Sequence, residues 1–245
     1  QEALALERDA QKIDPHVVLL QFLGLNDFIN NGIAFAEKNR SENDAWRPYF
    51  NVELPLNEPI YLNPEIHFLR KFSAIFRFFD AYYVNKYIYG IQAVKDNSEA
   101  CDAYVELFLE NNRKPAWQQA FAATNGIAKK ISGLIKPGQL FVAVYFPSPL
   151  ESSKRLWNEA VVEPMKKCAP GSTFDRSRGE MIFEAAFKAA GIETFSLLSA
   201  FQKAQDPEKL FDQTGHLSAR GHHLAGEQIA FHLFNKHSAR LGGRQ

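Results

Sequence analysis

The stretch His16-Val-Val-Leu-Leu-Gln-Phe-Leu-Gly24-Leu25-Asn26-Asp27 is an apolar run that ends in a glycine and two short polar residues. Such a run is typical of a strand buried on both faces of a parallel sheet, and the residues after Leu23 predict a loop. In open α/β sheets, ligands bind at these carboxyl ends of the strands. Asn26 is therefore the first residue to consider for a chemical role.

Two further apolar runs predict strands at 140–146 and 192–197. Apolar periodicity, capping residues and breakers predict helices around them, at 1–13, 98–110, 115–135, 151–167, 176–190 and 218–237. Strands that alternate with helices indicate a parallel sheet covered on both faces. The sequence therefore predicts an α/β protein, a three-layer α/β/α sandwich, as a single domain over residues 1–245.

A long segment at about 32–97 interrupts this alternation. Residues 37–64 are polar and rich in proline but carry aromatic side chains, which predicts an ordered insertion beside the strand end. Residues 65–89 predict a helix with rings at steps of three and four. This stripe favours core packing over an acyl-binding wall, and its members are Phe68, Phe72, Phe76, Phe79, Tyr83 and Tyr87.

Composition excludes some classes of partner. The formal net charge is zero, from 28 basic and 28 acidic residues, and no dense basic patch occurs, so we expect no nucleic acid partner. Cys101 and Cys168 lie far apart and form no Cys-x-x-Cys, which indicates neither a metal motif nor a disulfide framework. No apolar run has the length of a membrane span.

The first residues carry acids where a signal peptide has a basic patch and then an apolar run. A covering helix at 1–13, before any strand, leads us to expect that earlier strands are missing, together with any targeting segment or membrane anchor. The compartment and the oligomeric state stay open, with the cell envelope or the extracellular space as options for the compartment.

A second polar site is predicted in the loop before the last helix, where Asp212 and His216 lie four residues apart and Ser218 is suited to cap the helix. A carboxylate that holds one imidazole nitrogen leaves the other free to act as a general base. Taken alone, such a pair on a loop is more often solvated surface.

Together, these two stretches resemble blocks of the SGNH hydrolases, also called GDSL-type lipases and acylhydrolases. Gly24-Leu25-Asn26-Asp27 matches the Gly-x-Asn-Asp block at the end of a buried strand, and the stretch 216–222, His-Leu-Ser-Ala-Arg-Gly-His, follows the block that contains the family histidine. The resemblance implies a flavodoxin-like fold without its first strands. It also implies an ester hydrolase of bacterial type that uses a Ser-His-Asp mechanism without cofactor or metal.

Carried over by position, the resemblance makes His216 the base, Asp212 its orienter, Asn26 an oxyanion donor and Gly24 a substrate-binding residue. The expected substrate is a small-molecule, glycan or lipid ester, and the residues do not identify which. The family spacing between the acid and the histidine is usually shorter, so Asp206 and Glu208 stay open as alternative orienters of the ring.

The nucleophile of the family lies in a Gly-Asp-Ser block, which this sequence does not contain. Ser148, between two prolines, favours a rigid turn over a nucleophile. We therefore expect this chain to be inactive by itself. The alternative is an SGNH-like protein that binds a glycan or lipid without cleaving it. A metal site at His216, His222 and His223 is disfavoured, because the adjacent pair on one helix points in different directions.

Overall fold

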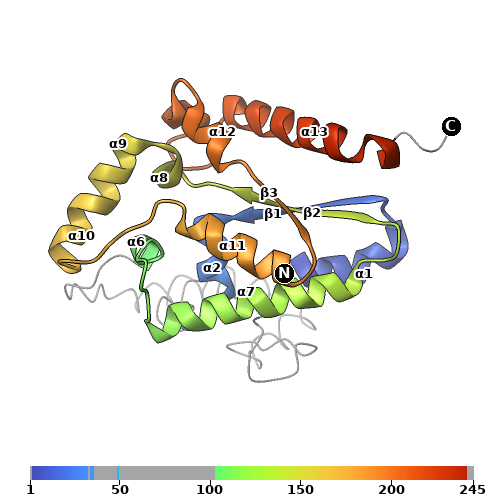
Figure 1. The fold of residues 1–245 in the computed structure, drawn as a ribbon, viewed down its shortest axis with the longest axis horizontal. Helices are drawn as coiled ribbons and strands as arrows, with labels where there is room; N and C mark the ends of the chain where they lie inside the picture. The colour runs from blue at the N-terminus through green and yellow to red at the C-terminus, as the bar shows by residue number, and fades with distance from the viewer. Residues whose placement is uncertain (1, 33, 36–48, 50–102, 242–245) are drawn as a thin grey trace, which may run out of the picture. The chain divides into compact units, whose positions relative to one another are not determined.

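The computed structural model describes residues 2–32, 34, 35, 49 and 103–241 (Figure 1). The predicted proline-rich insertion and the aromatic helix at 65–89 lie outside these residues, apart from residue 49, as does the predicted helix start at Ser98. Contacts group the chain into two compact units, one made of 1–15, 26–100 and 112–136 and the other of 16–25, 101–111 and 137–245. The single domain stays a prediction.

The second unit contains a parallel sheet, as predicted. Its strands are β1 (Val17–Leu23), β2 (Leu140–Phe146) and β3 (Glu193–Ser196), and they pair in the order β1-β2-β3. Val17 lies opposite Leu140, and Val142 lies opposite Glu193. Every side chain of β2 is buried, which agrees with its uninterrupted apolar sequence.

Helices cover both faces of this sheet (Figure 1). On one side, α12 (Leu198–Lys203) and α13 (Ala219–Leu241) form a core with alternate residues of β2, which are Leu140, Val142, Val144 and Phe146. On the other side, the rings of Phe183 and Phe187 from α11 (Arg178–Ala189) contact Phe22 of β1. The second unit thus has an α/β/α layout of its own.

The expectation that β1 is buried on both faces is wrong for the middle of the strand. Leu19 is 45% exposed and Gln21 is exposed as well. Within the described sheet β1 is an end strand, and α12 and α13 pack over β2 and β3. An apolar sequence therefore identified the strand but not its place at the end of the sheet.

Two predicted elements have different boundaries. The residues after β1 are not a loop, because α2 (Gly24–Asn31) begins directly at Gly24. The single helix predicted at 151–167 is broken, because Ser153 is extended and its hydroxyl caps a new helix. The four pieces are α8 (Pro149–Ser152), α9 (Lys154–Trp157), the π-helical η3 (Asn158–Val162) and α10 (Glu163–Cys168).

The remaining helices of the described residues are α1 (Glu2–Ile13), α6 (Ala103–Glu106), α7 (Pro115–Leu134) and the 3-10 turn η4 (Pro207–Leu210). In the first unit α1 packs on α7, with Glu7 paired to Lys130 at 3.0 Å. In the second unit Cys168 is disulfide-bonded, which the sequence analysis did not predict. No helix in the described part of the chain has the length and hydropathy of a membrane span.

Candidate active site

The loop at 212–216 is closed by an antiparallel bridge between Phe211 and Leu217. Inside it, the backbone N–H of Asp212 donates to the carbonyl of His216 at 2.8 Å, and Gly215 N donates back to the Asp212 carbonyl at 3.1 Å. Gly215 has φ +84°, a left-handed conformation that favours glycine. This glycine lets a tight loop accommodate four-residue spacing between Asp212 and His216.

The carboxylate of Asp212 reaches the imidazole of His216 through Thr214. Asp212 Oδ1 accepts from the Thr214 hydroxyl at 2.6 Å, from Thr214 N at 2.8 Å and from His216 N at 3.1 Å. These hydrogen bonds lower the pKa of Asp212 below its usual range, and the one from the Thr214 hydroxyl has the largest effect. The same hydroxyl oxygen lies 2.7 Å from His216 Nδ1. The sequence placed Asp212 and His216 together but missed the threonine between them.

The hydroxyl of Thr214 determines which imidazole nitrogen carries the proton. A carboxylate only accepts, so the contact to Asp212 uses the single hydroxyl hydrogen. The contact to His216 Nδ1 then requires the imidazole to donate. A neutral imidazole that donates through Nδ1 keeps its lone pair on Nε2. This hydrogen-bond network therefore assigns His216 the tautomer that a general base needs.

Ser218 caps α13, as predicted, and fixes the end of the loop. Its hydroxyl accepts from Gly221 N at 3.2 Å and donates to the carbonyl of Lys209 at 2.7 Å. A Cβ atom at Gly221 would lie 2.1 Å from the carbonyl oxygen of Leu210. The glycine thus lets the first turn of α13 approach the end of η4.

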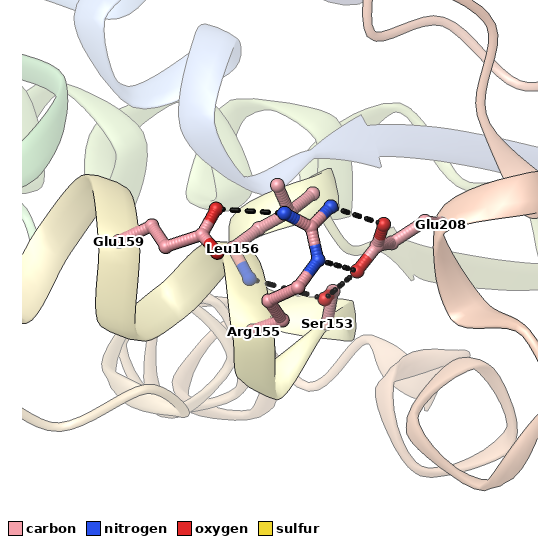
Figure 2. A network of polar contacts seen from close by, with 5 residues as sticks. All are labelled: Ser153, Arg155, Leu156, Glu159 and Glu208. Atoms are coloured by element: carbon pink, nitrogen blue, oxygen red, sulfur yellow. Dashed lines mark hydrogen bonds and ion pairs between the residues drawn. The ribbon is translucent and has the colours of Figure 1, made fainter.

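The start of η4 is held by a polar network (Figure 2). Arg155 binds both carboxylate oxygens of Glu208, with the Nε–Oε1 distance at 3.0 Å, and its Nη1 lies 2.7 Å from Glu159. Ser153 donates to Glu208 at 2.7 Å. Because Glu208 lies shortly before the loop, this network positions the chain that enters it.

The two alternative orienters thus have other partners in the structure. Glu208 binds Arg155 and Ser153, while Asp206 pairs with Lys209 at 3.1 Å and with Arg220 at 3.8 Å. Of the three acids considered from sequence, Asp212 is the one that contacts the backbone N–H of His216 and, through Thr214, its ring.

Ser148 has a structural role at the end of β2. Its hydroxyl accepts from Glu151 N at 3.3 Å and donates to Glu151 Oε2 at 2.8 Å, while Ser148 N donates to the same oxygen at 2.8 Å. This is a capping box for α8. A Cβ atom at Gly215 would lie 3.9 Å from Pro149, so the histidine loop lies beside this turn.

Glu151 is fully buried beneath this turn, and the sequence analysis missed it. Tyr145 donates its hydroxyl to Glu151 Oε1 at 2.6 Å. Burial raises the pKa of Glu151 to about 7, although hydrogen bonds from Ser148 and Tyr145 act in the opposite direction. The Ser-x-x-Glu spacing at 148–151 is a capping-box pattern that is visible in the sequence.

Gly24 and Gly179 both approach the hydroxyl of Tyr145. A Cβ atom at Gly24 would lie 1.9 Å from this oxygen, and one at Gly179 would lie 2.3 Å from it. The glycine of the Gly-Leu-Asn-Asp stretch is therefore needed to pack the end of β1 against β2. Asn26 is exposed in the first turn of α2 and belongs to the first unit, whereas His216 belongs to the second.

No protein-family model, curated protein or solved structure matches the chain.

His222 and His223 are exposed on the first turns of α13, where His223 lies 3.2 Å from Glu227. A different set of side chains of types that can hold a metal ion, Glu193 of β3 with His232 and His237 from the second half of α13, comes together in the second unit. No local sequence pattern indicates this set, because Glu193 is 39 and 44 residues from the two histidines.

Proposed function

We propose that this chain carries the acid–base part of an SGNH-type serine esterase or acylhydrolase site. The observation that carries the proposal is the hydrogen-bonded chain from Asp212 through Thr214 to Nδ1 of His216, in which Nε2 takes no part. An imidazole that is oriented through Nδ1 and connected to a carboxylate, here through a threonine hydroxyl, is suited to act as a general base in acyl transfer.

In the proposed reaction, His216 Nε2 takes the proton of a serine hydroxyl as that oxygen attacks the ester carbonyl. The imidazole then returns the proton to the leaving alcohol, and a water molecule repeats the sequence on the acyl-enzyme. While the ring is protonated, Nδ1–H donates to the Thr214 oxygen, and the Thr214 hydroxyl donates to the carboxylate of Asp212. These two hydrogen bonds form a relay between the ring and the carboxylate. The relay thus stabilises the imidazolium without any proton on Asp212.

The sheet order supports the fold assumed by the proposal. Three parallel strands that lie side by side in chain order correspond to the last three strands of the flavodoxin-like order 2-1-3-4-5. The loop with His216 follows the third of these strands. Ligands of such sheets bind at the carboxyl ends of the strands, where the Ser148 turn lies beside Gly215.

Two parts of the proposed site depend on the sequence resemblance alone. Asn26 is proposed as an oxyanion donor and Gly24 as a substrate-binding residue because of the Gly-x-Asn-Asp match. The nucleophile is proposed to come from a Gly-Asp-Ser segment outside these 245 residues. The proposed substrates are small-molecule, glycan or lipid esters.

The proposal is tested on the protein from the whole gene with a short-chain nitrophenyl ester. We expect hydrolysis, and we expect His216→Ala to lower kcat by at least about 1000-fold because the general base is lost. His223→Ala, at an exposed histidine of the following helix α13, is the matched control and should retain parental activity. Full activity of the His216 variant would refute the mechanism. An inactive whole protein without Gly-Asp-Ser would support the glycan- or lipid-binding alternative.

Thr214 provides a separate test of the relay. Thr214→Val keeps the shape of the side chain but removes the hydroxyl, so His216 loses its fixed tautomer. We expect kcat to fall by roughly 100-fold with little change in KM, near the lower end of the contribution of general-base catalysis. Thr214→Ser keeps the hydroxyl and should restore most of the rate. Equal rates for the Val and Ser variants would show that the hydroxyl has no role.

A further inference from the structure

Three metal-binding side chains meet where the last part of α13 crosses the start of β3. Glu193 Oε1 lies 2.9 Å from His232 Nε2 and 3.0 Å from His237 Nε2. One ligand atom from each residue lies within 4.8 Å of the other two. The two histidines come from one helix and the carboxylate from a strand, so the group joins two layers of the fold.

The side chains of this group are held in place by their surroundings. His232 stacks on the ring of Phe195, with 4.2 Å between ring centroids and 22° between ring planes. His237 is 9% exposed. Glu193 lies opposite Val142, on the face of the sheet that α13 covers. Both imidazoles therefore direct Nε2 toward one carboxylate from fixed positions.

We propose that Glu193, His232 and His237 form a binding site for a divalent transition metal, with Zn²⁺ as the ion that fits best. Two imidazoles, one carboxylate and a water molecule are a common ligand set of zinc. Ligand atoms about 2.0–2.1 Å from a tetrahedral zinc ion lie roughly 3.3 Å apart. The present Nε2–Oε1 distances of 2.9 and 3.0 Å require a small outward adjustment, and the two Nε2 atoms lie within 4.8 Å of each other.

Lys236 is the internal competitor of the metal. Its Nζ lies 3.0 Å from the same Glu193 oxygen, and its side chain is 56% exposed. An ammonium and a metal ion cannot share this oxygen at close range without repulsion. Because Lys236 is on the surface, its side chain can turn into solvent when the ion binds. Removing its charge should therefore strengthen metal binding.

The site is distinct from the proposed esterase site. From Ala219 at the start of α13 to His232 the helix rises about 20 Å at about 1.5 Å per residue. The histidine loop precedes Ala219, whereas Glu193 begins β3 at its amino end. The inference therefore does not depend on ester hydrolysis. A bound ion would fasten the end of α13 to β3 and raise the stability of the folded chain.

The test is a Zn²⁺ titration of the metal-free 245-residue chain by calorimetry, with melting temperature as a second readout. We expect one ion per chain and a higher Tm, and a Co²⁺ titration should give the visible absorption of a tetrahedral site. Glu193→Gln and His232→Gln should each weaken binding by more than about 100-fold, beyond the cost of losing a hydrogen-bond partner of a ligand.

Two further variants make the result specific. His223→Gln, at an exposed histidine of the same helix, should leave binding unchanged, and Lys236→Gln should raise the affinity severalfold. Circular dichroism confirms that each variant is folded before titration. Absence of zinc uptake by the parent chain would overturn the proposal. So would binding that survives both Glu193→Gln and His232→Gln, whatever the effect of His223→Gln.

Discussion

Gly24→Ala is expected to destabilise the fold by about 2 to 3 kcal/mol, within the range for overpacked cores. The new methyl group would lie 1.9 Å from the Tyr145 hydroxyl and 2.3 Å from the ring carbon that carries it. Tyr145 is fully buried and cannot retreat, because Gly179 lies close to the same hydroxyl from another element. Urea denaturation of the parent and variant chains measures the difference.

Gly133→Ala is the matched control for this substitution. Gly133 lies in α7, and a Cβ atom there would meet no neighbour within 4 Å. Alanine favours helix over glycine by about 0.5–1 kcal/mol, so this variant should be slightly more stable than the parent. If the Gly24 variant were as stable as the Gly133 variant, the expected clash between the new methyl group and Tyr145 would be contradicted.

Glu151 is expected to make stability fall as the pH rises toward neutrality. Its pKa is about 7 in the folded chain against an ordinary value of 4.5, so between these values the folded state binds more protons than the unfolded state. Unfolding free energy should therefore decrease from pH 4.5 to pH 7 and level off above it. The difference between the two pKa values corresponds to a decrease of roughly 3 kcal/mol in the unfolding free energy over this pH range.

Glu151→Gln isolates this effect, because glutamine has the shape of the protonated carboxyl, with one oxygen that can accept from Ser148 and an NH2 group that can donate to the Tyr145 oxygen, and does not titrate. The difference in unfolding free energy between parent and variant, measured in urea across this pH range, should change by the same amount. Glu163→Gln, at an exposed position on α10, is the control and should follow the parent curve. A constant difference between parent and Glu151→Gln would contradict the raised pKa.

Local sequence patterns predicted much of the secondary structure. The apolar runs at 140–146 and 192–197 became β2 and β3, and Pro115 and Gly191 mark the ends of helices as expected. These features depend on residues that are neighbours in the chain. The exposure of Leu19 was missed because it depends on which strand lies beside β1, and the sequence does not contain that information directly.

The polar sites were harder to predict because they depend on distant residues or on loop geometry. Thr214 is two residues from both Asp212 and His216, but its role requires the left-handed turn at Gly215. Glu193 is 39 residues from His232 and 44 from His237, and the chain gives no local sign that they meet. The Glu193 group thus depends on the packing of α13 against β3, and the Thr214 contacts depend on the turn of the loop.

The network around Arg155 has a consequence for the ionic environment of the site. Its charges are largely exposed, so dissolved ions screen the attraction between Arg155 and Glu208. The Tyr145–Glu151 hydrogen bond is buried and is shielded from those ions. Raising the ionic strength would therefore weaken the contacts that hold the residues before the His216 loop. The buried Tyr145–Glu151 hydrogen bond beneath the Ser148 turn would stay intact.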